Sequence, residues 1–178
     1  MHRNNPAKRQ VSAPLAFFFM LGTLLFSVSA FATHHADDEK DPSEEDIMTT
    51  LQHDKRFSTL VSAIEAAGIS DILRATGEIT VFAPTNEAFE QIPADKLESL
   101  LKPENKEKLV RILSFHVVEG IVNAEQAASM RQAESIEGTD LDLRTKGGKL
   151  LVQDAMVDEE NIMTNNGIIH AIDKVLMP

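Results

Sequence analysis

Residue types that are able to do chemistry are sparse in this chain. Its 178 residues include no cysteine, so disulfides, zinc–thiolate sites, iron–sulfur clusters and a cysteine nucleophile are excluded. Tryptophan and tyrosine are absent too, which removes the usual stacking surfaces for sugars and bases. The sequence contains no His-Glu-x-x-His, no Gly-x-Ser-x-Gly and no phosphate-cradling glycine-rich loop. We therefore expect no enzyme activity and no cofactor.

The histidines are the remaining candidates for catalysis or metal binding. His53, His116 and His170 are too far apart in the sequence to predict a metal site. His170 and Asp173 have the residue types of an acid–base pair. Because side chains alternate along a strand, however, a spacing of three residues directs this pair to opposite faces.

A different kind of site is conceivable near the N-terminus, at Thr33, His34 and His35. If a signal peptidase leaves Thr33 first, then its free amine, two amides and the imidazole of His35 can hold Cu(II) or Ni(II) in a square plane. This site depends on the cleavage position. The simpler interpretation is a pair of exposed histidines in a linker.

Residues 1–32 have the pattern of a secretory signal peptide. Three basic residues precede an apolar run, and Ala30-Phe31-Ala32 supplies a small-x-small cleavage site. We predict a mature start at Thr33, with Val28-Ser29-Ala30 as a second site. An uncleaved anchor is the alternative, because about 20 apolar residues can span a bilayer. Cleavage predicts export to the periplasm, cell surface or medium, with no stable membrane insertion afterwards.

The rest of the chain is acidic, in contrast to the predicted signal peptide. The residues after position 32 carry 14 basic and 28 acidic side chains. Residues 33–46, THHADDEKDPSEED, hold seven acids and no large apolar residue, which predicts a flexible acidic linker. A body this acidic is repelled by polyphosphate, so we expect no nucleic-acid partner.

Residues 47–178 are predicted to form one domain that begins with helices. Ser43 followed by three acids is typical of a helix N-terminus, and apolar spacing predicts a second helix that ends near Gly68. The β-rich run at residues 79–82 predicts a strand that Pro84 stops, with Thr85 capping the next helix.

The pattern after residue 115 is mostly that of strands. Hairpin turns are predicted at residues 146–149 and 165–167. Alternating or β-rich runs predict strands at residues 116–118, 141–144, 150–152, 155–157 and 168–172. Helices that come first and strands that come last predict an α+β fold rather than a doubly wound parallel sheet.

Three blocks of this sequence resemble the signatures of the fasciclin (FAS1) domain family. They are residues 80–89 (TVFAPTNEAF), 115–120 (FHVVEG) and 166–173 (NGIIHAID), and the likeness covers essentially all of residues 47–178. The resemblance implies a wedge of two β-sheets packed against several α-helices. It also implies secretion or surface display, roles in cell adhesion and matrix contact, and a domain that is generally non-catalytic.

The signature residues are interpreted as mainly structural. His116 is expected to be buried in a strand, neutral and hydrogen-bonded to nearby backbone, and the resemblance implies that it ties this strand to the first block. Phe115 stands where the family usually has tyrosine, which puts an adhesion role of the Tyr-His pair in doubt. The full set is Thr80, Phe82, Pro84, Thr85, Phe89, His116, Asn166, Gly167 and His170.

The candidate partner contact is the segment Asp158, Glu159, Glu160, Asn161 and Ile162. Animal adhesion members that this chain resembles carry an Asp-Ile pair where Asn161-Ile162 stands. Asparagine supplies no negative charge to a receptor's metal ion, which argues against direct integrin binding. The neighbouring acids also fit a plain solvated face.

Three functions follow from these observations. The leading hypothesis is an exported, non-enzymatic module for cell adhesion or surface contact, with a protein or matrix partner. The second is a binding protein for an apolar small molecule such as a carotenoid or lipid, in which Met130, Met156, Met163 and Met177 would line an adaptable groove. The third is an unrecognised hydrolase.

Overall fold

The computed structural model describes residues 44–75 and 77–178, which belong to one compact unit. The predicted signal peptide and most of the predicted linker lie outside these residues, together with Thr33, His34, His35 and Ser43.

The first described helix, α1 (Ile47–His53), has Asp46 and not Ser43 as its N-cap. The Asp46 carboxylate lies directly before the helix and accepts a hydrogen bond of 2.7 Å from the Thr49 backbone N–H.

Helices dominate the first half of the described chain, as expected. Gly68 has the left-handed φ of 70° that ends α2. One short helix was not predicted: α7 starts at a capping box in which the Asn123 and Gln126 side chains each bond the other's backbone N–H. The elements after α1 are η2 (Lys55–Phe57), α2 (Ser58–Ala67), α3 (Ser70–Ala75), α4 (Asn86–Glu90), α5 (Ala94–Leu101), η3 (Pro103–Asn105), α6 (Lys106–Phe115) and α7 (Ala124–Ser129).

Seven strands complete the fold and confirm the α+β class. They are β1 (Ile79–Pro84), β2 (Val117–Glu119), β3 (Gln132–Glu134), β4 (Asp140–Lys146), β5 (Lys149–Val152), β6 (Ala155–Thr164) and β7 (Gly167–Ile172). Their spatial order is β2-β1-β7-β6-β5-β4-β3. The pair β1–β7 is parallel, and the other pairs in this series are antiparallel.

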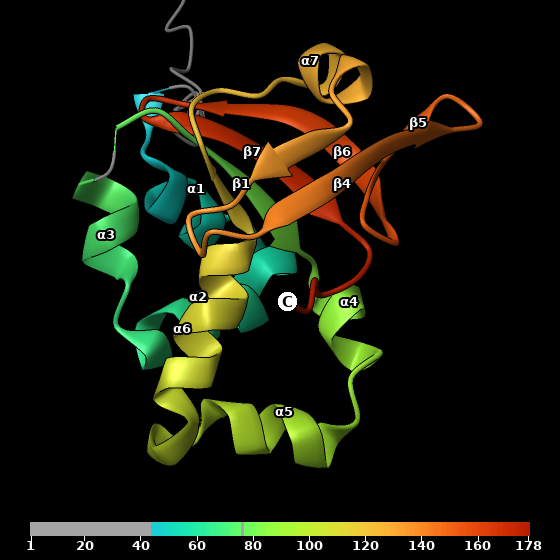
Figure 1. Cartoon of the computed structure of the whole chain (residues 1–178). Coiled ribbons are helices and arrows are strands. Elements are labelled where there is room, and N and C mark those ends of the chain that lie inside the picture. Colours follow the sequence, from blue (N-terminus) through green and yellow to red (C-terminus); the bar gives the residue numbers. More distant parts are fainter. Residues whose placement is uncertain (1–43, 76) are drawn as a thin grey trace, which may run out of the picture. The chain divides into compact units, whose positions relative to one another are not determined.

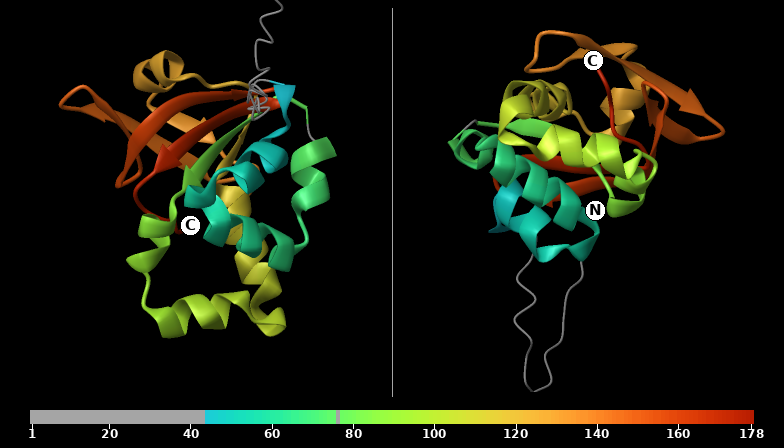
Figure 2. Two further views of the ribbon diagram at one scale, coloured as in Figure 1. Left: turned by 180° about the vertical axis from the view of Figure 1, so that it is seen from behind. Right: turned by 90° about the horizontal axis from the view of Figure 1, so that it is seen from below.

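The two sheets of the expected wedge are connected in one series of strands through β6. The start of β6, at Ala155 and Met156, pairs with β5, and the remainder of β6 pairs with β7 across two register shifts. A bridge between Val118 and Ser135 also brings the two ends of the series together. The strands therefore surround an interior, while α1, α2 and α6 lie on the opposite side of β1 and β7 (Figures 1 and 2).

The side-chain alternation of β1 and β7 separates two apolar clusters. Val81 and Ile169 face the helices, whereas Phe82 and Ile172 face the interior between the strands. The helix-side core consists of Ile47, Met48, Leu51, Phe57, Leu60, Ala63, Ile64, Ala67, Ile69, Leu73, Ile79, Val81, Ala83, Phe89, Leu109, Leu113, Val117, Ile169 and Ala171. The strand-side core consists of Phe82, Phe115, Val118, Val122, Ala127, Ala133, Leu141, Leu143, Leu150, Val152, Ala155, Val157, Ile172 and Leu176.

Both predicted hairpin turns are present. Gly147 and Gly148 have φ values of 62° and 82° between β4 and β5, as a tight two-residue turn requires. At the start of β7, Gly167 is needed for a different reason. A Cβ atom there would overlap the Ile79 carbonyl oxygen and lie 2.7 Å from Cδ1 of Ile47.

Candidate functional site

Thr80 of the first block is fully buried in β1 and serves the backbone of a loop. Its hydroxyl donates to the Gly120 carbonyl over 2.7 Å and accepts from the Val122 N–H over 2.8 Å. The Gly120 carbonyl and the Val122 N–H lie in a loop and pair with no strand through these bonds. The Thr80 hydroxyl therefore supplies hydrogen bonds to backbone groups that its loop shields from water.

His170 lies in β7 beside Thr80's loop and is also fully buried. Its Nε2–H donates to the Val122 carbonyl over 2.9 Å, which leaves Nδ1 to accept from the Asn161 N–H at 3.3 Å. The ring stacks on Phe82 with centroids 5.4 Å apart. Burial lowers the pKa of His170, so the neutral ring acts as a hydrogen-bonding strut between three segments.

His116 is placed differently from the prediction, because it is the C-cap of α6 and precedes β2. Its Nδ1–H donates to the Ile112 carbonyl over 2.7 Å, and its Nε2 accepts from the Leu176 N–H over 2.9 Å. Burial lowers the pKa of His116 to about 4, although the Ile112 bond opposes that shift. The tie to the first block runs through the backbone, where the His116 carbonyl accepts from the Phe82 N–H.

Thr85 occupies the N-cap position of α4, but its hydroxyl makes no capping hydrogen bond. The side-chain hydrogen bonds at this corner are made by the next residue, Asn86. The Asn86 Oδ1 accepts from the Thr59 N–H over 3.0 Å, and its Nδ2 donates to the Lys55 carbonyl over 2.9 Å. Asn86 thus joins α4 to η2 and α2, a role that its position after Pro-Thr did not reveal in the sequence.

Asn166, in the β6–β7 turn, bonds the backbone of two helices, α1 and α3, that are distant in the sequence. Its Oδ1 accepts from the Ile47 N–H at the start of α1, and its Nδ2 donates to the Leu73 carbonyl in α3, each over 2.9 Å. Together with the space restriction at Gly167, these bonds give the third block a role in assembling α1, α3 and β7.

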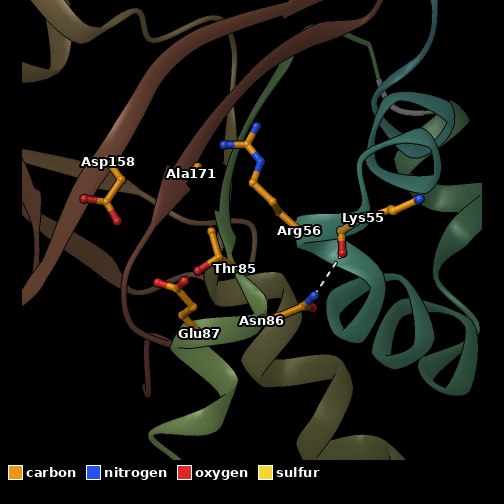
Figure 3. A pocket seen from close by; sticks show the side chains of 7 residues that line it. All are labelled: Lys55, Arg56, Thr85, Asn86, Glu87, Asp158 and Ala171. Atoms are coloured by element: carbon orange, nitrogen blue, oxygen red, sulfur yellow. Dashed lines mark hydrogen bonds between the residues drawn. The ribbon is translucent and has the colours of Figure 1, made fainter.

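The surface where functional groups converge is a pocket of about 370 Å³ at the end of the first block. Figure 3 shows Thr85, Glu87 and Asp158 around the opening, while the Lys55 ammonium extends away from the two carboxylates. The lining residues are Lys55, Arg56, Thr85, Asn86, Glu87, Asp158 and Ala171, and we call this site the β1–α4 pocket.

Arg56 at the edge of this pocket is already engaged by two carboxylates. Its guanidinium donates to Asp54 at 2.6 to 3.1 Å and to Glu159 at 2.6 Å, and it lies 5.5 Å from the centroid of the Phe57 ring. Its hydrogen bonds lower the pKa of the Asp54 carboxyl. The charged side chains that line the pocket are therefore Glu87, Asp158 and Lys55, together with Arg56, whose charge is already shared with Asp54 and Glu159.

The candidate contact segment 158–162 has four exposed residues and one half-buried residue, Ile162. Asp158, Glu159 and Glu160 are exposed. Asn161 has a left-handed φ of 62° at an irregular part of β6, and its Oδ1 accepts from the Ala124 N–H over 2.9 Å. Ile162 packs against the helix-side core. Asn161 is exposed too, but its Oδ1 is already bonded, and Glu159 is paired with Arg56, so Asp158 and Glu160 are the residues of this segment most open to a partner.

The four methionines considered for an apolar groove do not line one groove. Met130 contributes to a pocket of about 390 Å³ beside Val118 and Val122, whereas Met177 contributes to another beside Ile112. Across residues 44–75 and 77–178, no group of three His, Asp or Glu side chains is arranged to hold a metal ion. Within the same ranges, no helix is long and apolar enough to cross a bilayer.

Comparisons with known proteins identify the family. The Fasciclin domain model matches residues 55–178. Protein sll1483 of Synechocystis sp. is 48% identical over 132 residues, which cover 74% of this chain and 73% of that protein. Transforming growth factor-beta-induced protein ig-h3 of Sus scrofa is 38% identical over 132 residues, or 74% of this chain, but this match spans only 19% of the pig protein.

The fold is found in a solved structure as well. A FAS1 domain pair from the insect cell adhesion molecule Fasciclin I matches with a TM-score of 0.69 and 16% identity, over 76% of this chain and 52% of that one. The expected arrangement of helices and strands is thus that of a FAS1 domain. The chain belongs to the fasciclin domain family.

Proposed function

We propose that this protein is an exported, non-enzymatic interaction domain that contacts a protein or matrix partner in cell adhesion or surface attachment. The observation that carries the proposal is the contrast between its histidines and its surface acids. The two buried histidines are occupied by backbone hydrogen bonds, whereas Glu87 and Asp158 stand exposed at an open pocket. The carboxylates of Glu87 and Asp158 are therefore accessible to a binding partner, whereas the buried histidines are not.

Membership of the fasciclin family supports this proposal, because the family resemblance implies adhesion and a generally non-catalytic domain. Export rests on the predicted signal peptide at residues 1–32. An exported domain without cysteine must be stabilised by its core alone, and the two large apolar clusters fit that requirement.

The β1–α4 pocket is the proposed contact surface. Its floor is rigid, because Asn86 is held by the Thr59 N–H and the Lys55 carbonyl. A backbone that is already held in place lowers the entropy lost on binding, because that part of the surface need not be ordered by the partner.

The test is binding of the purified, fluorescently labelled chain to intact cells and extracellular material of the producing organism. We expect the double variant Glu87→Lys, Asp158→Lys to lose most of the binding. The matched control is Glu98→Lys, Glu104→Lys, which makes the same charge change at exposed positions on α5 and η3. Equal binding by both variants would contradict the role of the pocket, and no binding by the wild type would contradict the function.

The second candidate, binding of an apolar small molecule, is favoured by the pocket near Met130. Val118, Val122 and Ala133 of the strand-side core line this pocket, with Met130 and Ile136 exposed beside them. Organic extraction of the protein purified from its own organism tests this candidate. Stoichiometric pigment or lipid would support it, and loss of that ligand in Ala133→Glu would assign it to this pocket.

A further inference from the structure

One pair of residues in the chain has a chemical reactivity that the proposed function does not use. Asn166 is followed by Gly167, and this is the only Asn-Gly pair in the 178 residues. The backbone nitrogen of the residue that follows an asparagine can attack the side-chain amide carbon. Glycine hinders this attack least because it has no side chain. The pair is therefore the site in this chain most prone to spontaneous deamidation.

The reaction needs no reagent other than water. The Gly167 nitrogen loses its proton and forms a bond to Cγ of Asn166, while the Cγ–Nδ2 bond breaks and Nδ2 leaves as ammonia. The product is a cyclic succinimide. Water then adds to one of the two carbonyl carbons and opens the ring, which leaves either aspartate or isoaspartate at position 166. No atom is oxidised or reduced.

The fold holds both polar atoms of the reacting amide. Beside the start of α1 (Figure 1), Oδ1 of Asn166 accepts from the Ile47 N–H and Nδ2 donates to the Leu73 carbonyl, each over 2.9 Å. The Asn166 carbonyl accepts from the Ile79 N–H over 3.3 Å, and Gly167 pairs with Ile79 in the parallel β1–β7 ladder. Closure of the ring turns Cγ toward the Gly167 nitrogen and removes Nδ2. Deamidation therefore requires the bonds to α1 and α3 to open first.

Aspartate at position 166 would not restore these bonds. A carboxylate can still accept from the Ile47 N–H, but it has no proton to donate to the Leu73 carbonyl. Two oxygens would then face each other near the C-terminal end of α3, where negative charge is unfavourable. Leu73 is 3% exposed, so water replaces the lost donor poorly.

Isoaspartate is more disruptive, because it lengthens the main chain by one carbon atom between position 166 and Gly167. Gly167 packs so closely against β1 that an added Cβ atom would overlap the Ile79 carbonyl oxygen. A longer link shifts Gly167 relative to β1 and relative to Thr164, its partner across the β6–β7 turn. The register of β7 is lost with that shift.

We propose that Asn166 is a deamidation site that the native fold keeps closed, and that its conversion makes unfolding irreversible. Folded chains retain the amide, whereas a chain that stays unfolded is converted to a form that no longer assembles α1, α3 and β7. Chemical modification of the unfolded state is a general cause of irreversible unfolding. This site is distinct from the β1–α4 pocket, and the inference does not rest on the proposed function.

Peptide mapping by mass spectrometry tests whether the fold closes the site. The wild-type chain is held at neutral pH with and without guanidinium chloride, and the aspartate and isoaspartate forms at position 166 are quantified over time. We expect conversion to be more than about a hundredfold slower in the folded chain, because a stable domain is unfolded for about 10⁻³ of the time or less. Equal rates in the folded and unfolded chains would overturn the inference.

Two other asparagines are internal controls for the same map. Asn165 precedes Asn166, and Asn105 precedes Lys106, so in both cases a side chain hinders the attacking nitrogen. In guanidinium chloride both should react more slowly than Asn166. If either reacted as fast as Asn166, the assignment of the reactive site to the Asn-Gly pair would be wrong.

Refolding tests the consequence of the conversion. Samples taken over time from guanidinium chloride at neutral pH are diluted into buffer, and circular dichroism gives the refolded fraction. This fraction should fall in step with conversion of Asn166. Chains kept in the same denaturant at mildly acidic pH, where the Gly167 nitrogen loses its proton less readily, should refold fully at neutral pH. Refolding of chains that are already converted at Asn166 would refute the proposal.

The variant Asn166→Asp isolates one product from any other damage to the chain. The matched control Asn105→Asp makes the same charge change at an amide whose Nδ2 donates only to the Ser99 carbonyl and hydroxyl at the surface. We expect Asn166→Asp to unfold at a lower denaturant concentration than Asn105→Asp, or not to fold at all. Equal unfolding midpoints would show that the fold does not need this amide, which would also overturn the inference.

Discussion

The helix-side core and the strand-side core share β1 and β7, yet they are completed in different ways. On the helix side, most backbone groups are paired within the helices, and polar side chains such as Asn86 and Asn166 are needed only where helices start or end near a neighbouring element. On the strand side, loops cross the end of the cluster, and Thr80, His116 and His170 bond the backbone of residues 120–122, 161 and 176.

This difference explains why polar signature residues are buried in a domain with no evident chemistry. A loop that covers a core brings N–H and C=O groups out of water, and each must find a partner. Short polar side chains on the adjoining strands provide those partners. The signature histidines thus mark where irregular backbone is buried.

The largest expected effect comes from a change that disturbs both cores at once, Gly167→Ala. The new Cβ would overlap the Ile79 carbonyl oxygen and break the parallel β1–β7 pairing. We expect a loss of about 4 kcal/mol or more in the free energy of unfolding, measured by urea denaturation. Gly77→Ala is the control, because its Cβ would meet no atom within 4 Å and the cost should stay within about 0.5 kcal/mol. Equal stability of the two variants would contradict the close approach at β7.

Thr80→Val tests the polar bonds of the strand side without a large change of volume. It leaves the Gly120 carbonyl and the Val122 N–H buried without this partner. The expected loss is about 2 kcal/mol or more, because two groups are left unsatisfied and each costs at least about 1 kcal/mol. Thr80→Ser keeps the hydroxyl and should retain most of the stability. If Val and Ser were equally tolerated, the loop would not depend on this residue.

The pH dependence of stability tests His116 on the same side. Its folded pKa of about 4 lies below the unfolded value of 6.5, so the unfolded state binds more protons between these values. Stability should therefore fall as the pH drops from about 6.5 to 4, by up to about 1.4 kcal/mol per pH unit from this residue. The lowered pKa of His170 acts in the same direction.

The measurement is urea denaturation of wild type and His116→Gln across that pH range. Glutamine does not titrate, so the variant should be less stable at pH 7 but lose less stability on acidification. Parallel pH profiles for the two proteins would show that His116 does not titrate on unfolding.

Arg56→Met should have the smallest effect, because its ion pairs lie at the surface. Arg56 is half exposed and shares its charge with Asp54 and Glu159. The expected loss is below about 1 kcal/mol, measured by thermal unfolding at low and high salt. A loss as large as that of Thr80→Val would mean that the surface ion pairs of Arg56 contribute as much stability as a buried bond. It would contradict the view that the important polar bonds lie at the strand-side core.

The strands and turns could be predicted because their signals are local. The alternation of residues 141–144 and the two glycines of the β4–β5 turn specify a hairpin without reference to the rest of the chain. Helix α7 was missed because it has six residues, of which Ala124 and Ala127 are buried, too few to produce a visible apolar stripe.

The pocket and the struts could not be predicted in the same way, because their partners are distant in the sequence. Thr80 bonds a residue 42 positions away, and Asn166 bonds one 119 positions away. The β1–α4 pocket combines residues from η2, the start of α4 and β6. Sequence blocks marked Thr85 and Asp158 separately, but only the fold brings them to one opening.

The parallel pairing of β1 with β7 has a consequence for how the chain is made. Strand β1 has no partner on that side until residues 167–172 have left the ribosome, and both cores need β7. Contacts between such distant segments form slowly, because a long loop must close first. Completion of both cores therefore waits for β7, and a nascent chain in which residues 167–172 are still inside the ribosome cannot close either cluster.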